Sequence, residues 1–327
     1  MPLVPRSELA TIARIAELLG GGGGATRGVI RGIGDDAAVL DPQGGRELVW
    51  TVDAQFEGQH FRRGWLTLED VGWRSFVAAA SDLAAMGAVP WCALSALGVP
   101  ENLGDADLDA LVTGQRQAAD AVGCPVVGGN LSRAGELSVT TTLLGTAKHA
   151  VRRGGAKPGE GVWLGGHVGL AALGLEALRA GRWGGELDAA VAAFRRPRVN
   201  IADGKALAGR ASAAIDVSDG LAADVAHLCE ASGVRVVLDR VALQGVSEVL
   251  RSMAGDGWLE LALHGGEDYA LVATSAEALP GFERVGVVEE GAGVWLASGE
   301  RREVIAPRGF DHFAFRPLLP ALSSGIG

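Results

Sequence analysis

Residues 213–231 read AAIDVSDGLAADVAHLCEA. The apolar run Ala213–Val217 predicts a buried strand, and the apolar residues of Leu221–Ala231 recur at helical spacing. Two acids, Asp216 and Asp219, stand where the strand ends and before the helix begins. Open α/β sheets place ligand-binding groups at such strand ends. The segment therefore predicts an α/β fold with functional acids between a strand and a helix.

The composition describes a globular chain that is long enough for two domains. Of its 327 residues, 48% are hydrophobic and 21% are charged, so the chain can bury substantial cores. With 29 basic and 39 acidic residues its formal charge is −10, which argues against a nucleic-acid partner. Phosphate ligands remain compatible with this charge, because carboxylates can hold them through divalent cations.

Cysteine usage and the lack of targeting patterns predict a cytoplasmic protein. The cysteines are dispersed and form no C-x-x-C pair, which favours buried thiols in a reducing compartment: Cys92, Cys124 and Cys229. The segment MPLVPRSELA at the start shows no secretory signal pattern. The uncharged run 83–100 approaches the length of a membrane span, but glycine and proline interrupt it. No membrane association is expected.

The order of predicted elements favours two units that mix helices and strands. In the first half we expect helices over 67–86 and 105–122, and strands over 47–53, 91–99, 125–129 and 137–147. In the second half we expect helices over 169–180, 188–196, 201–210 and 221–231, and strands over 161–165, 213–217, 234–239, 269–274, 284–289 and 294–297. The segment RRGGAKPG at 152–159 is the best boundary, which predicts domains 1–150 and 151–327.

Several common sites are excluded by the sequence. It has no G-x-x-x-x-G-K-[ST] loop for nucleotide phosphates, no H-E-x-x-H motif and no G-x-S-x-G nucleophile elbow. The best candidate for a dinucleotide fingerprint, LGGHVG at 164–169, has leucine in place of the first glycine. The site must therefore be sought among other residues.

Acids at the ends of predicted elements form the remaining candidate site. They lie beside small residues at Asp35–Asp36, Asp53, Asp82, Asp216, Asp219 and Glu267–Asp268. Any one of them alone is best explained as a cap or turn residue. Asp82, however, lies in a predicted helix among alanine and leucine, where an unpaired carboxylate is costly. Because no arginine or lysine lies between Arg74 and Arg116, a metal ion is a reasonable partner, and Mg²⁺ suits such acids.

A series of motifs resembles thiamine-monophosphate kinases, a family within the aminoimidazole-ribonucleotide-synthetase-like group of ATP-using enzymes. In order, the motifs are GIGDDAAVL, VDAQFEGQHF, SDLAAMGAVP, VVGGN, RRGGAKPG, IDVSDGLAADVAHL and HGGEDYALVAT. The likeness runs from about residue 7 to the segment GFDHF at 309–313, essentially the whole chain. SDLAAMG and GGEDY are the specific motifs, whereas GIGDDAA alone indicates only the larger group.

The resemblance implies both a fold and an activity. The fold would be α/β (α+β), with two domains, mixed sheets flanked by helices and the active site between the domains. The reaction would transfer the γ-phosphoryl group of ATP directly and in line to thiamine monophosphate, with several Mg²⁺ ions spreading the developing charge. A homodimer is implied, in which the N-terminal domain binds metal and ATP and the C-terminal domain completes the substrate site.

The resemblance also assigns individual residues by position. The implied metal ligands are Asp36, Thr51, Val52, Asp53, Asp82, Asn130, Asp216 and Asp219. The implied contacts to ATP are Gly129, Asn130, Arg153 and Ser218. The implied contacts to thiamine monophosphate are His60, Glu267 and Phe310. No residue is expected to act as a covalent catalyst, because positioning and electrostatics dominate phosphoryl transfer.

Two positions depart from the pattern of the family. The family usually has GGD where this chain has Gly128-Gly129-Asn130, and asparagine keeps an oxygen ligand but loses the charge. One metal site should therefore be weaker or differently occupied. Val52 replaces a polar residue, which is harmless if that contact uses the backbone carbonyl.

Other interpretations stay open at this point. The same scaffold could perform ATP-dependent amidine cyclisation, although that chemistry does not call for GGEDY, or it could bind thiamine phosphates or nucleotide without turnover. Selenophosphate synthesis would require a reactive cysteine near the start of the chain, where none precedes Cys92. His60 could be a packed core histidine beside Phe56 and Phe61, and Glu267–Asp268 could simply cap a turn.

Overall fold

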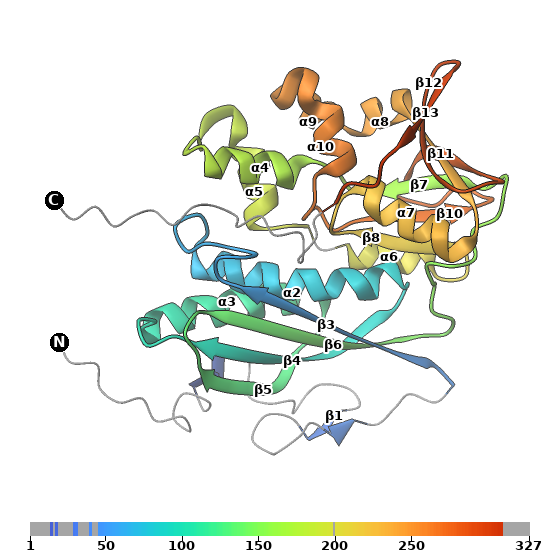
Figure 1. The fold of residues 1–327 in the computed structure, drawn as a ribbon. Helices are drawn as coiled ribbons and strands as arrows, with labels where there is room; N and C mark the ends of the chain where they lie inside the picture. Colours follow the sequence, from blue (N-terminus) through green and yellow to red (C-terminus); the bar gives the residue numbers. More distant parts are fainter. Residues whose placement is uncertain are drawn as a thin grey trace.

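The computed structural model describes residues 14–15, 17–18, 29–31, 39–40, 45–198 and 200–309. In its first half a four-stranded sheet has the order β3-β6-β4-β5 and is covered on one face by two long helices (Figure 1). These elements are β3 (Glu47–Phe56), β4 (Val89–Val99), β5 (Val126–Arg133), β6 (Ser138–Ala147), α2 (Leu68–Ala85) and α3 (Asp105–Val122). A separate pair joins β1 (Val29–Arg31) to β2 (Val39–Leu40).

The second half contains a seven-stranded sheet of order β13-β12-β9-β11-β7-β10-β8. Its strands are β7 (Gly161–Gly165), β8 (Ala213–Val217), β9 (Arg235–Asp239), β10 (Ala270–Ser275), β11 (Glu283–Glu289), β12 (Gly293–Ser298) and β13 (Arg301–Ile305). Its helices are α4 (Leu170–Arg179), α5 (Asp188–Arg195), α6 (Ile201–Leu207), α7 (Leu221–Ser232), α8 (Arg240–Val246), α9 (Glu248–Ala254) and α10 (Trp258–His264), with 3₁₀ turns at Gly185–Leu187 and Gly255–Gly257. The four-stranded and seven-stranded sheets each combine one parallel pair with antiparallel pairs, which confirms the predicted mixed α/β fold.

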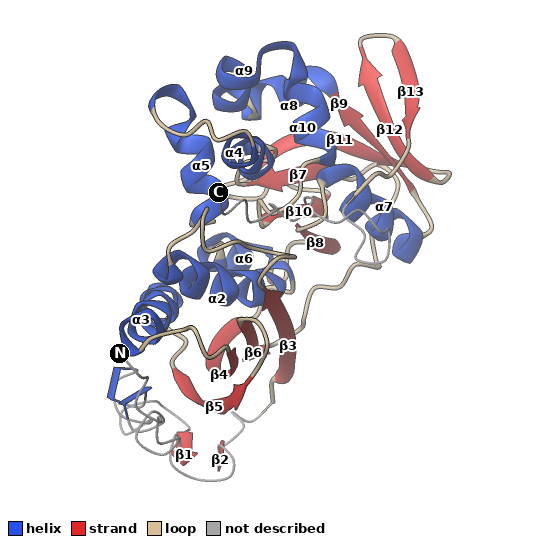
Figure 2. Ribbon diagram, turned by 60° about the vertical axis from the view of Figure 1, so that its left-hand side comes forward, coloured by secondary structure: helices blue, strands red, loops and turns tan. Residues whose placement is uncertain are grey.

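Helix α2 lies between the four-stranded sheet and the second half of the chain (Figures 1 and 2). It begins at a capping box in which Thr67 and Asp70 satisfy each other's backbone N–H groups. Thirteen of its 18 residues are buried, most of them alanine, serine or glycine. On one side Phe76 shares a core with the sheet, and the same core includes Ala214 of β8 and Leu271 of β10.

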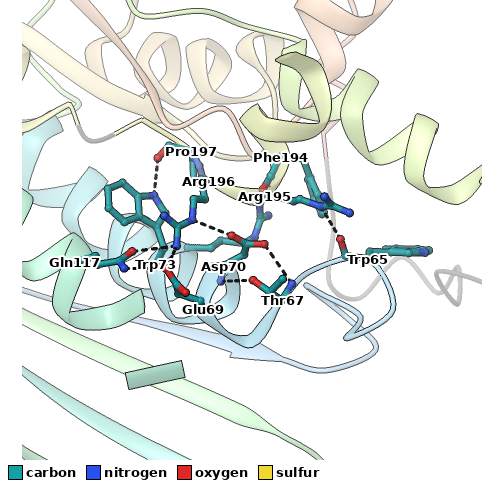
Figure 3. A network of polar contacts seen from close by, with 11 residues as sticks. Trp65, Thr67, Glu69, Asp70, Trp73, Gln117, Phe194, Arg195, Arg196 and Pro197 are labelled. Carbon is teal, nitrogen blue, oxygen red and sulfur yellow. Dashed lines mark hydrogen bonds and ion pairs between the residues drawn. The ribbon is translucent and has the colours of Figure 1, made fainter. Parts of the chain in front are cut away.

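A polar network fastens the segment after α5 to the first turn of α2 (Figure 3). The guanidinium of Arg196 donates to Glu69 at 2.7 Å and to Asp70 at 2.8 Å. The indole N–H of Trp73 donates to the carbonyl oxygen of Pro197 at 2.9 Å. These contacts join residues that are more than a hundred positions apart in the sequence, so they help to fix how the two halves meet.

The division into domains at residue 150 stays a prediction. One sheet is built from residues 47–147 and the other from residues 161–305, as the boundary suggested. The hydrophobic core, however, runs across this boundary through α2. Among the residues that the structure describes, none of the helices combines the length and apolar character of a membrane-spanning segment.

Two glycines allow α2 and α3 to approach closely. A Cβ atom on Gly72 would lie 1.9 Å from the carbonyl oxygen of Leu111, and one on Gly114 would lie 1.8 Å from that of Glu69. Both distances are impossible for non-bonded atoms, so each helix needs glycine where it crosses the other.

We therefore expect Gly114→Ala to lower the free energy of unfolding by about 3 kcal/mol, because the helices must separate to admit the methyl group. Denaturant titration measures this loss. Gly245→Ala is the matched control, since Gly245 lies in α8 with no atom near its Cβ position. That variant should keep or slightly raise the stability. Equal stability of the two variants would contradict the proposed close approach.

Candidate active site

Strand β3 carries polar side chains on the face that looks toward α2. Its residues alternate between the two faces of the sheet, with Val49, Thr51, Asp53 and Gln55 on the inner face. Val49 is part of the core, and the three polar residues follow it along the strand. Val52 points the other way and leaves its side chain 63% exposed.

The first pair of acids joins β3 to α2. The hydroxyl of Thr51 donates to a carboxylate oxygen of Asp82 at 2.5 Å, and the amide of Gln55 donates to Asp53 at 2.8 Å. Burial raises the pKa of both carboxyls, and the charge of Asp53 raises the pKa of Asp82 further. Asp82 therefore has the partner that the sequence required, a hydroxyl group, in addition to any ion.

The neighbouring helix residue links α2 to the second half of the chain. The hydroxyl of Ser81 donates to Asp216 at 2.8 Å, and Asp216 is buried at the end of β8. Burial and then the charge of Asp82 raise the pKa of Asp216. Acids from both halves thus meet at one end of α2, as the sequence predicted.

Arg153 places a positive charge beside these acids. Its charge lowers the pKa of Asp82 and of Asp216, although burial outweighs this effect in both. Arg153 is an exposed residue, so it is available to an anionic ligand.

Asp224 belongs to the same cluster and was missed by the sequence analysis. Its carboxylate accepts the backbone N–H groups of Asp219 and Gly220, both at 3.1 Å, and so shapes the turn before α7. Burial, followed by the charges of Asp216 and Asp219, raises the pKa of Asp224 to about 7. The signal was present in SDGLAAD, where a third acid follows the turn in the first helical turn.

A cavity of about 500 Å³ lies beside the acids and gathers four predicted site residues. It is lined by His60, Ser218, Asp219 and Glu267, which come from segments far apart in the sequence. The Nδ1 atom of His60 accepts the backbone N–H of Phe56 at 3.0 Å, so the imidazole is held at the cavity wall. His60 is only partly buried, which disfavours the alternative of a core histidine.

The two acids of GGEDY have different roles. Asp268 accepts the backbone N–H groups of Gly169 at 2.5 Å and Ala171 at 2.9 Å, so it caps α4. Glu267 instead lines the cavity, and its carboxylate also pairs with the buried guanidinium of Arg74, which does not line it. Asp268 thus caps a distant helix and not the turn after Gly265-Gly266, whereas Glu267 faces the cavity.

Gly129 and Asn130 lie on β5, at the opposite edge of the sheet from β3. Three strand spacings of about 4.8 Å put β5 about 14 Å from β3. A Cβ atom on Gly129 would lie 1.7 Å from the carbonyl oxygen of Ser95, so the sheet itself requires glycine there. The register aligns Asn130 with Ala96, Thr140 and Ala54, which places its side chain on the outer face. The amide of Asn130 donates to Ser132 at 3.2 Å, and its role at a metal stays a prediction.

Asp36 and Phe310 lie outside the residues that the structure describes, so their predicted roles remain open. Within the described residues, no three histidine, cysteine, aspartate or glutamate side chains converge on one point as a preformed metal site. The acids form a chain of neighbours instead. Their raised pKa values reflect lost hydration and mutual repulsion, both of which a divalent cation would offset. The donor set therefore fits Mg²⁺, with water and phosphate oxygens completing the coordination.

The burial of Asp268 makes a testable statement about pH. Burial raises its pKa to about 7, far above its ordinary value, so the folded state holds the protonated form more tightly than the unfolded state does. The stability from this group is present at pH 4 and is lost as the pH rises to about 7. Relative to Asp268→Asn, the wild-type free energy of unfolding should fall over this range, by at most about 1.4 kcal/mol per pH unit. A constant difference between the two proteins in denaturant titrations at pH 5 and pH 8 would show that burial does not raise the pKa of Asp268 in this way.

Comparison with known proteins agrees with the geometry. The family model for "AIR synthase related protein, N-terminal domain" matches residues 34–147. A thiamine-monophosphate kinase of Aquifex aeolicus is 33% identical over 289 residues, which cover 86% of this chain and 92% of that protein.

Solved structures give the same result for the fold. The thiamine-monophosphate kinase of Stenotrophomonas maltophilia superposes with a TM-score of 0.79 at 32% identity, covering 89% of this chain and 96% of that one. A structure of AaThiL complexed with AMPPCP and TMP superposes with a TM-score of 0.77 at 30% identity, covering 95% of this chain and all of that one. The chain belongs to the thiamine-monophosphate kinase family.

Proposed function

We propose that the chain transfers the γ-phosphoryl group of ATP to thiamine monophosphate and so forms thiamine diphosphate. The observation that carries this proposal is the convergence of Asp53, Asp82 and Asp216 from both halves of the chain next to a cavity lined by Ser218 and Glu267. A relative with the same fold was solved with AMPPCP and TMP bound. A cytoplasmic location is part of the proposal and is supported by three cysteines that are free and buried.

The acids would hold the metal that the reaction needs. We assign this role to Asp53, Asp82, Asp216 and Asp219, together with Thr51 and the backbone of Val52. The family pattern also implies Asp36 and Asn130, although the Asn130 side chain lies on the outer face of the sheet and its assignment rests on that pattern alone. Mg²⁺, when bound, would neutralise the charge on the phosphates that react. The chain contributes the alignment, because hydrogen bonds from Thr51, Ser81 and Gln55 orient the carboxylates before any ligand arrives.

The remaining residues would position the two substrates for in-line transfer. Arg153 and Ser218 would contact ATP, and Gly129 would let the nucleotide approach the backbone of β5. The charge of Arg153 beside Asp82 and Asp216 suits a terminal phosphate that lies at the acids. Glu267 and His60 would face the thiamine half, with Phe310 beside them, since a carboxylate attracts the cationic thiazolium ring.

The activity is tested by incubating the purified chain with ATP, Mg²⁺ and thiamine monophosphate and following thiamine diphosphate by chromatography. Formation of thiamine diphosphate with equal ADP supports the proposal. ADP formed only with an aminoimidazole precursor would instead indicate amidine cyclisation. Binding of thiamine monophosphate without any product would indicate a catalytically silent member of the family.

Replacing Asp53 should separate catalysis from stability. Asp53→Asn keeps an acceptor for Gln55 but removes the charge, so we expect turnover to fall about a hundredfold or more. The free energy of unfolding should stay within about 1 kcal/mol or rise, because burial already disfavours the ionised form. Asp203→Asn is the control, since Asp203 is a partly buried acid that pairs with the exposed Arg198 and belongs to none of the candidate site residues. Parallel losses of activity and stability in Asp53→Asn would point to a structural role.

The outer face of β3 supports the predicted homodimer. Four apolar side chains are exposed along this strand: Leu48 at 53%, Trp50 at 72%, Val52 at 63% and Phe56 at 39%. The indole N–H of Trp50 already donates to Thr142 at 2.6 Å, so the ring offers an apolar surface with its polar atom satisfied. An exposed apolar edge strand of this kind invites another chain. We propose that a second copy of this chain covers it.

Trp50→Glu should therefore convert the dimer to a monomer, because it places a charge in the middle of the apolar face. Sedimentation velocity at micromolar concentration measures the change. Trp183→Glu is the matched control, since Trp183 is also exposed but lies between α4 and α5. A wild-type monomer, or a Trp50→Glu variant that still sediments as a dimer, would exclude this interface.

A further inference from the structure

Arg74 is a fully buried cation in the middle of α2. Its side chain has no exposed surface, which is unusual because arginine is almost never fully buried unless it is paired. No family motif quoted above includes it, and the acid cluster does not use it as a ligand. A charge in this position requires a specific partner.

The guanidinium of Arg74 joins three separate parts of the chain. One terminal nitrogen donates to the carboxylate of Glu267, and the other donates to the carbonyl oxygen of Phe194 at the end of α5. The guanidinium carbon also lies 4.3 Å from the centre of the Phe194 ring. This geometry uses the rigid fork of arginine, which lysine cannot reproduce. Arg74 therefore connects α2, α5 and the segment before β10.

Glu267 is held in an unusual conformation at the cavity. Its φ angle is +73° and that of Tyr269 is +51°, values that non-glycine residues seldom adopt. The hydroxyl of Tyr269 donates to the same carboxylate at 2.7 Å, and the backbone N–H of Glu267 donates to Ser218 at 2.7 Å. Such a conformation persists only where surrounding contacts enforce it. Arg74 is the buried, charged member of this set of contacts.

Stability alone does not account for Arg74. A buried ion pair is often no more stabilising than well-packed apolar residues of the same size. The Nε atom of Arg74 is also buried without a hydrogen-bond partner, which makes burial of this side chain still less favourable. The side chain of Glu267, in contrast, is 28% exposed and faces the cavity beside His60 and Asp219. The arrangement favours a role in placing that carboxylate.

We propose that Arg74 is a positioning residue that sets the affinity for thiamine monophosphate by fixing the carboxylate of Glu267. Arg74 does not line the cavity and acts only through Glu267. The inference rests on the proposed function, because it takes the cavity at Glu267 to hold the cationic thiamine half. Arg74 thus influences the affinity for thiamine monophosphate from the side of Glu267 that faces away from the ligand.

The test compares Michaelis constants for both substrates in Arg74→Met, which keeps the approximate volume of the side chain. We expect the KM for thiamine monophosphate to rise about tenfold while the KM for ATP changes less than about twofold. Glu267→Gln should show the same selective rise. In the Glu267→Gln background, Arg74→Met should add almost nothing, because the two residues act as one unit.

Arg196→Met is the matched control. Arg196 also connects the end of α5 to α2 (Figure 3), but it pairs with Glu69 and Asp70 and does not touch Glu267. This variant should lose stability and leave both Michaelis constants unchanged. If it raises the KM for thiamine monophosphate as much as Arg74→Met does, the effect comes from the contact between the halves and the proposal is overturned.

Tyr269→Phe provides a second route if Arg74→Met does not fold. It removes one hydrogen bond to Glu267 and leaves Arg74 in place, so a selective rise of about threefold in the same KM is expected. Equal changes in both Michaelis constants, or none in either, would refute the positioning role while the wild type still forms thiamine diphosphate. A wild type that forms none would overturn the proposed function and this inference together.

Discussion

The burial of α2 between the two halves of the chain is the constraint on which the site depends. Small residues allow this helix to contact the four-stranded sheet, α3 and the second half at once. A helix buried on all sides cannot leave a polar side chain unpaired. Three of its inward polar residues therefore pair with groups from distant segments: Arg74 with Glu267, Ser81 with Asp216, and Asp82 with Thr51. Packing of one helix thus assembles groups from three distant segments.

The same packing brings carboxylates together, and a bound cation can relieve their repulsion. Asp82, Asp216 and Asp224 are crowded and poorly hydrated. Burial and then the charges of neighbouring acids raise the pKa of all three carboxyls. Folding therefore stores unfavourable repulsion at the position where phosphate and cations are proposed to bind. Binding of a cation there relieves the repulsion, so part of the favourable binding energy comes from the fold. A site of this kind needs few cationic side chains, which agrees with the small number of cations that act on these acids: Arg153 on Asp82 and Asp216, and Arg74 on Asp53.

Local elements were predictable because their signals are local. The predicted helix over 105–122 and the strand over 213–217 match α3 and β8 residue for residue. Helical periodicity between two glycines marks the first, and a short apolar run marks the second. The strand β13 and the short helices α8 and α9 were missed, because such short segments carry little periodicity. The pairing of Arg74 with Glu267 spans 193 positions and has no local signal. Gly129 was assigned to the nucleotide, yet the adjacent strand is sufficient to require a glycine there.

The adjacent acids Glu267 and Asp268 show why the segment before β10 is strained. Adjacent side chains of a regular strand point to opposite faces of the sheet. In this segment Asp268 instead caps α4, and Glu267 faces the cavity. The left-handed φ angles at Glu267 and Tyr269 make both placements possible within a few residues. The cap on α4 and the contacts of Arg74 and Tyr269 with Glu267 offset the unfavourable energy of these backbone conformations. The capping role of Asp268 and the cavity-facing role of Glu267 therefore depend on each other, because a shift in the backbone of either residue would displace the side chain of the other.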